Sequence, residues 1–144
     1  AKIDVHTYDD PRSFSLFDDK ICFDSYYENE LHIMDLNTGE IVWSYQAEAH
    51  IRADEILLKY GDLIITHLDY TAIPNPNEGT HVMGTSGSGA LVAINMTTKR
   101  EVWQFPTRTN SVWSAQLRDS VLYFASNEEG IYALDADTGQ VRWL

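Results

Sequence analysis

The side chains best suited to metal binding or catalysis in this chain are five histidines and one cysteine. The histidines stand at positions 6, 32, 50, 67 and 81, and none shows the close spacing that zinc sites use. His50, His67 and His81 could meet at one end of a sheet, but scattered strand and surface positions explain them better. Cys22 lies between Ile21 and Phe23, which favours a small buried side chain over a catalytic thiol. We therefore predict no catalytic residue, no metal and no cofactor.

The charge of the chain narrows the range of ligands. Acidic residues outnumber basic residues by 22 to 10, so the net charge is −12. This balance argues against nucleic acid, because phosphate contacts need clustered lysine and arginine. The acidity is explained by solubility, by a salt-tolerant host or by attraction to a cationic partner. No apolar run is long enough to cross a bilayer.

One nine-residue pattern occurs three times, and it defines the elements that would position any site. It reads Asp-Leu-Asn-Thr-Gly-Glu-Ile-Val-Trp at 35–43, Asn-Met-Thr-Thr-Lys-Arg-Glu-Val-Trp at 95–103 and Asp-Ala-Asp-Thr-Gly-Gln-Val-Arg-Trp at 135–143. The tryptophans at 43, 103 and 143 are 60 (103 − 43) and 40 (143 − 103) residues apart. A period of about 40 residues, with about 20 more in the middle copy, indicates propeller blades.

Each copy reads as four short strands joined by turns, which is one propeller blade. The predicted strands are 13–17, 21–23, 31–34 and 41–45 in the first copy, 55–58, 63–67, 91–94 and 102–105 in the second, and 111–117, 121–125, 131–134 and 140–143 in the third. We therefore predict an all-β chain that forms a partial β-propeller of about three four-stranded antiparallel blades. The single domain covers 1–144, with repeats at about 9–45, 51–105 and 110–144.

The repeated residues have structural roles in this reading. Glycine takes the left-handed conformation that ends a type I turn with a bulge, and a leading Asp or Asn accepts hydrogen bonds from the turn. The tryptophans are expected to pack between neighbouring blades rather than to line three ligand sites. The structural motif consists of Asp35, Thr38, Gly39, Trp43, Asn95, Thr98, Trp103, Ala133, Asp135, Thr138, Gly139 and Trp143.

The third copy, from Ala133 to Trp143, resembles the tryptophan-docking motif of the PQQ-like β-propeller proteins. The first copy departs from that motif at Ile33, and the second has Asn95 and Lys99. The family includes quinoprotein dehydrogenases, which enclose a quinone within a complete ring, and non-catalytic scaffolds such as lipoproteins that assist outer-membrane protein assembly. Because this chain has one cysteine and about three blades, it is closer to the scaffolds. The resemblance slightly favours an extracytoplasmic location, although the sequence contains no signal peptide.

The extra residues of the middle copy fall in a loop at 69–89, which exceeds the usual length of a structureless connection. Partner contacts are predicted at Tyr70, Ile73, Glu78, His81 and Met83 in this loop. The same face should carry acidic residues from all three copies: Glu28, Glu30, Glu48, Asp69, Glu128 and Glu129. A protein with a basic surface is therefore the expected partner.

Three blades are too few to close a ring, because propellers typically have four to eight. We therefore expect self-association or completion by another propeller segment. Three functions remain open at this point. The first is a non-enzymatic protein-protein interaction or scaffold module, the second is an inhibitor or immunity protein with an acidic loop face, and the third is a segment or subunit of a quinone-dependent dehydrogenase.

Overall fold

The structure is a computed structural model, and it describes residues 14–25, 28–51, 56–69, 89–107, 112–126 and 130–143. These residues form strands and turns. None of the described residues belongs to a helix long and apolar enough to cross a membrane.

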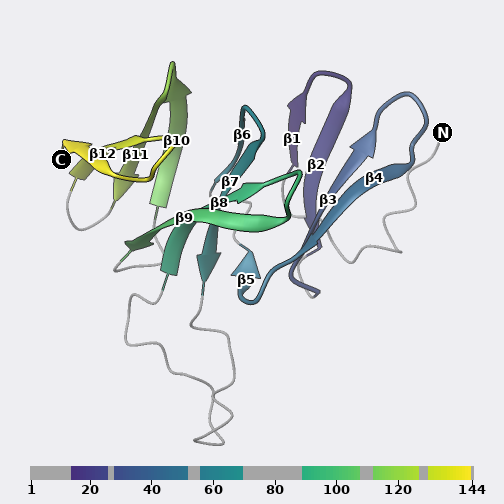
Figure 1. Ribbon diagram of the computed structural model, residues 1–144, viewed down its shortest axis with the longest axis horizontal. Coiled ribbons are helices and arrows are strands. Elements are labelled where there is room, and N and C mark those ends of the chain that lie inside the picture. The colour runs from purple at the N-terminus through teal and green to yellow at the C-terminus, as the bar shows by residue number, and fades with distance from the viewer. Residues whose placement is uncertain are drawn as a thin grey trace, which may run out of the picture.

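The strands form three antiparallel sheets, which follow one another along the chain (Figure 1). We call them blades 1, 2 and 3. Blade 1 contains β1 (Phe14–Phe17), β2 (Lys20–Ser25), β3 (Glu30–Asp35) and β4 (Ile41–Gln46). Blade 2 contains β5 (His50–Ile51), β6 (Leu57–Tyr60), β7 (Leu63–Asp69), β8 (Gly89–Asn95) and β9 (Arg100–Thr107). Blade 3 contains β10 (Val112–Arg118), β11 (Val121–Ser126), β12 (Gly130–Asp135) and β13 (Val141–Trp143).

Blades 1 and 3 are simple meanders of four strands, in the orders β1-β2-β3-β4 and β10-β11-β12-β13. In each blade, consecutive strands are paired along their length, so the chain passes back and forth across one sheet before it enters the next. The arrangement confirms the prediction of an all-β, partial β-propeller with three blades.

Blade 2 differs from the expected meander in its first strand, which is split. Both β5 and β6 pair with β7: Ile51 lies opposite Leu68, and Leu57 lies opposite Thr66. His67 is therefore the one residue of β7 between the two segments. We predicted a single first strand at 55–58, because a two-residue segment such as His50-Ile51 shows no alternation by which a sequence pattern can be recognised.

A β-bulge precedes the repeated tryptophan in every blade. In blade 1, Trp43 lies opposite Ile33 whereas Ile41 lies opposite Met34, so Val42 is the extra residue. The same shift sets Trp103 opposite Ala93 and Trp143 opposite Ala133. A bulge redirects the strand and its side chains. The alanine position of the repeated motif is thus the cross-strand neighbour of the indole, and Ile33 occupies it in blade 1.

The core consists of two apolar layers, one between each pair of neighbouring blades. The first layer includes Cys22, Leu31, Ile33, Ile64, Leu68, Val92 and Ile94. The second includes Ile65, Leu91, Ala93, Trp103, Leu122, Phe124 and Leu134. Alternate residues of β7 and β8 enter different layers, so both faces of blade 2 are buried. This double burial explains why Ala90–Ile94 is an uninterrupted apolar run.

Candidate functional site

The three turns at 35–39, 95–99 and 135–139, which we call the docking turns, share one hydrogen-bonding pattern. In the first, Asp35 Oδ1 accepts from the backbone N–H groups of Asn37 and Thr38 at 2.8 and 3.1 Å. Asn95 Oδ1 makes the equivalent two bonds in the second turn at 2.8 and 3.0 Å, and Asp135 Oδ1 makes them in the third at 3.0 and 3.1 Å. The side-chain oxygen of asparagine therefore replaces that of aspartate, as expected.

The fifth residue of each docking turn has a left-handed backbone. The φ angles are 71° at Gly39, 56° at Lys99 and 72° at Gly139. Lys99 thus accepts a conformation that costs a residue with a side chain roughly 1–2 kcal/mol. The middle turn is the one degraded copy of the pattern, and its geometry nevertheless matches the other two.

A cation neutralises the leading aspartate in the two outer blades. Lys20 Nζ donates to Asp35 Oδ2 at 3.0 Å, and this bond, together with the N–H of Asn37, lowers the pKa of the Asp35 carboxyl. Arg142 Nη2 donates to Asp135 Oδ2 at 2.8 Å and lowers the pKa of the Asp135 carboxyl in the same way. Both carboxylates therefore stay charged well below neutral pH and keep the turns closed.

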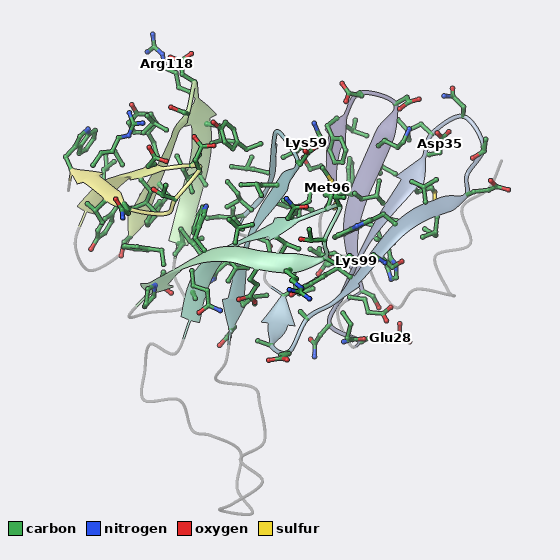
Figure 2. All side chains as sticks on the ribbon, viewed as in Figure 1. Glu28, Asp35, Lys59, Met96, Lys99 and Arg118 are labelled. Carbon is green, nitrogen blue, oxygen red and sulfur yellow. The ribbon has the colours of Figure 1, made fainter. Side chains whose placement is uncertain are left out.

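Each docking turn of blades 2 and 3 receives the indole of the preceding blade. Trp43 Nε1 donates to the carbonyl of Met96 at 2.7 Å, and Trp103 Nε1 donates to the carbonyl of Ala136 at 2.9 Å. Met96 and Ala136 both occupy the second position of their turns. Figure 2 shows Met96 and Lys99 on the side of blade 2 that faces blade 1. Trp43 and Trp103 thus each contact the docking turn of the next blade.

The opposite ends of the blades carry the connections in which partner contacts were predicted. Glu28 lies there, far from Asp35 and Arg118 (Figure 2). Its side chain is exposed, while its carbonyl accepts a 2.8 Å hydrogen bond from Gln46 Nε2. We call this end the loop end, and its described residues are 25, 28–30, 47–51, 69, 89, 107, 126 and 130. Of the predicted partner residues, Tyr70, Ile73, Glu78, His81, Met83, Glu128 and Glu129 lie outside the described residues.

The acidic face expected at the loop end is described only in part. Glu28 and Glu48 are exposed, which agrees with the expectation. Asp69 is only 5% exposed, so it is a buried residue at the base of the connection rather than part of an acidic surface. Its position opposite both His50 and Gly89 places it between two paired strands.

Two buried histidines lie near the loop end, His32 on β3 and His67 on β7. Of these, only His67 belongs to the three histidines that the sequence suggested could meet at one end of a sheet. His67 is fully buried, and its Nε2 lies 3.0 Å from Thr107 Oγ1. His32 is 4% exposed, with Nδ1 2.7 Å from Ser44 Oγ and Nε2 3.2 Å from a Glu30 oxygen. Burial lowers the pKa of His32, although Glu30 and Glu28 oppose this effect. The described residues contain no group of three His, Cys, Asp or Glu side chains that could hold a metal ion.

The reactivity of Cys22 provides a direct check on the first core layer. Burial raises the pKa of its thiol to about 12, with a smaller contribution from the Asp24 carboxylate. Because the thiolate is the reactive form, the native chain at pH 8 should react with an aromatic disulfide reagent about a thousandfold more slowly than the unfolded chain. Absorbance of the released thiol, with and without urea, measures both rates. Comparable rates would contradict the burial of Cys22.

Three solved structures resemble this chain over most of its length. BamB from Moraxella catarrhalis is 16% identical, with 86% of this chain and 33% of that chain covered and a TM-score of 0.60. A europium-containing methanol dehydrogenase is 14% identical, with 92% and 31% covered and a TM-score of 0.59. The quinohemoprotein alcohol dehydrogenase ADHIIG from Pseudomonas putida HK5 is 15% identical, with 92% and 26% covered and a TM-score of 0.60.

At these identities the likeness concerns the fold alone. The chain spans between about a quarter and a third of the length of these three structures, from 26% to 33%. A comparison with curated protein sequences gave no match. Scaffold and enzyme share the same blade architecture, so the fold does not choose between their activities.

The comparison with protein families is more specific. The model of the family described as outer membrane protein assembly factor BamB matches residues 28–144. That range contains all three docking turns and all three repeated tryptophans. Because this match covers most of the chain, the chain belongs to the PQQ-like β-propeller repeat family whose model is described as outer membrane protein assembly factor BamB.

Proposed function

We propose that this chain is a non-enzymatic scaffold module that binds another protein. The observation that carries the proposal is that the residues of the repeated motif are used to hold the fold together. Its Asp and Asn side chains close the docking turns, and the indoles of Trp43 and Trp103 join neighbouring blades. The motif thus builds a platform whose connections can vary. The matching family is described as an assembly factor, which also supports a role in binding proteins rather than in catalysis.

The partner proposed for the loop end is a protein with a basic surface. The net charge of −12 favours such a partner through long-range attraction. Glu28 is the exposed described member of the proposed contact set. Tyr70, Ile73, Glu78, His81, Met83, Glu128 and Glu129 complete the set, because they stand in the connections that leave this end of blades 2 and 3.

The charge also supports a second candidate, an inhibitor or immunity protein that covers the basic surface of one toxin or enzyme. Such a protein would show a single tight partner rather than several weaker ones. A third candidate, a segment of a quinone-dependent dehydrogenase, is supported by the likeness to the methanol and alcohol dehydrogenases. Absorbance from a bound quinone, or dye-linked oxidation of an alcohol, would favour that candidate over the scaffold.

The location of the partner site is tested by removing three charges at a time. The variant Glu28→Gln, Glu128→Gln and Glu129→Gln removes three of the proposed acidic contacts, and Asp18→Asn, Asp62→Asn and Asp119→Asn is a matched control in turns at the other end. Proteins captured by the intact chain should bind at least about tenfold more weakly to the first variant and nearly unchanged to the second. A rise from about 0.1 to 0.5 M salt should weaken binding similarly.

Two further observations decide this test. A chain in which residues 70–88 are replaced by a two-residue Asn-Gly turn should lose the same partner, because the replacement removes five of the proposed contacts and still allows Asp69 to pair with Gly89. Equal effects of the two charge variants, or an affinity that does not fall with salt, would refute a basic partner at the loop end. Calorimetric titration or surface plasmon resonance supplies the affinities.

Self-association is a separate part of the proposed function. Blades 1 and 3 each have a neighbouring blade on one side only, and exposed sheet edges must be covered to avoid uncontrolled association. We propose that another copy of the chain covers them.

A further inference from the structure

Among the described residues, blade 3 has a repeated tryptophan that meets no docking turn, and blade 1 has a docking turn that receives no indole. Trp143 occupies the position of Trp43 and Trp103, yet 51% of its surface is exposed, and its ring contact among the described residues is with Tyr123 at 5.9 Å. Leu36 occupies the position of the acceptors Met96 and Ala136, and it is 49% exposed. Trp103, which donates to the docking turn of blade 3, is only 7% exposed.

The space beside the glycines shows which docking turn is filled. A Cβ atom added at Gly139 would lie 2.5 Å from Cε3 of Trp103, so the indole lies directly against this glycine. A Cβ atom added at Gly39 would meet nothing within 4 Å. The two turns have nearly the same backbone, with φ of 71° and 72°. The turn of blade 1 therefore has the backbone of a docking turn, and none of the described residues lies against its glycine as Trp103 lies against Gly139.

We propose that Trp143 of one copy docks into the 35–39 turn of a second copy, with its Nε1 donating to the carbonyl of Leu36. This inference rests on the self-association proposed above and not on a basic partner. It extends to a second molecule the contact that the chain makes twice within itself. The contact is head-to-tail, and such contacts form a closed ring when the rotation between copies allows it.

Charge at the two outer faces agrees with this pairing. At the contact between blades 2 and 3, Tyr60 Oη donates to Asp137 Oδ2 at 3.3 Å. By strand register, Arg118 is the counterpart of Tyr60, since Arg118 pairs with Val121 as Tyr60 pairs with Leu63. The counterpart of Asp137 in blade 1 is Asn37, whose Nδ2 donates to Asp19 Oδ2 at 3.4 Å. Docking would thus bring an exposed arginine close to an acidic turn.

The contact is confined to the exposed rim of blade 1. Phe14 and Leu16 of β1 are 62% and 60% exposed, whereas Phe23 and Met34, on the same face of the blade, are 7% and 4% exposed. The centre of that face is therefore already covered, and the docking turn and β1 remain available. On blade 3 the matching surface consists of Trp143 and Ile131, which is 58% exposed.

Sedimentation velocity of the 144-residue chain tests the proposal, with Trp143→Ala, Trp143→Phe and the control Val102→Ala. Val102 is as exposed as Trp143, at 51%, but it lies on blade 2, which takes no part in the proposed contact. The unaltered chain should form a dimer. Trp143→Ala should raise the dimer Kd by about 30-fold or more, as expected for a buried tryptophan contact. Trp143→Phe, which loses the donor alone, should raise it about fivefold, and Val102→Ala should leave it unchanged.

Circular dichroism establishes that the variants are folded, as the exposure of Trp143 leads us to expect. Since both copies are acidic, the dimer should persist or tighten as salt is added, unlike binding to a basic partner. A chain that remains monomeric at about 100 μM would overturn both the docking and the self-association. A dimer that Trp143→Ala leaves intact would overturn the docking alone, and self-association would then use another surface.

Discussion

Replacing Trp103 with alanine is expected to lower the free energy of unfolding by about 3–5 kcal/mol. The side chain is 7% exposed, belongs to the second core layer and donates to the carbonyl of Ala136 at 2.9 Å. A domain of this size is stable by about 5–15 kcal/mol, so the loss is a large part of the total. Urea denaturation followed by circular dichroism measures it. Blade 3, which packs on blade 2 through this layer, should unfold first.

The adjacent Val102 provides the control for this substitution. It is 51% exposed, so Val102→Ala should change stability by less than about 0.5 kcal/mol. Trp103→Phe should fall between the two variants, because it keeps most of the apolar contact and removes the donor to Ala136. A loss below about 1 kcal/mol for Trp103→Ala would mean that the indole does not hold blades 2 and 3 together.

The second large effect is expected at Gly139. Gly139→Ala places a methyl group 2.5 Å from Cε3 of Trp103, and it also puts a side chain on a residue with φ of 72°. Gly39→Ala shares the backbone cost, at φ of 71°, but its methyl group would meet nothing within 4 Å. The difference between the two variants therefore isolates the collision with the indole. We expect Gly139→Ala to be less stable than Gly39→Ala by about 1–3 kcal/mol.

Denaturant midpoints give this difference, and tryptophan fluorescence gives a second reading of it. The indole of Trp103 must shift in Gly139→Ala, so the emission of the native state should change in that variant and not in Gly39→Ala. Lys99 shows that the turn itself accepts a side chain at this position. Equal losses of stability in the two variants would place the whole cost in the backbone and would disprove close packing between Trp103 and Gly139.

The parts of the fold that could be predicted are those fixed by local chemistry. Asp or Asn at the first turn position and glycine at the fifth determine the turn by hydrogen bonding and backbone freedom. The structure has both features at Asp35 and Gly39. The tryptophan spacing then predicted the number of blades. Lys99 has the same left-handed backbone without being a glycine.

The features that escaped prediction depend on partners distant in the chain. The acceptors of the two indoles are backbone carbonyls, at Met96 and Ala136, and any residue type supplies a carbonyl. His67 and Asp69 have side chains typical of a surface, and only the pairing of β5, β7 and β8 buries them. The split of the first strand of blade 2 also depends on a distant partner, because its two segments, β5 and β6, are defined by their pairing with β7. The predicted contact set at the loop end remains a prediction, apart from the exposure of Glu28.

The pairing of Asp69 with Gly89 closes the base of the longest connection in the chain. Because both ends of this connection are held by one cross-strand pair, its length hardly enters the stability of the sheets: doubling the length of a loop costs only about 0.6 kcal/mol of closure entropy. A foreign peptide could therefore be grafted between these two residues without remodelling the blades. The graft must retain Gly89, where a Cβ atom would lie 2.7 Å from Thr107 Oγ1 and 2.8 Å from His67 Nε2.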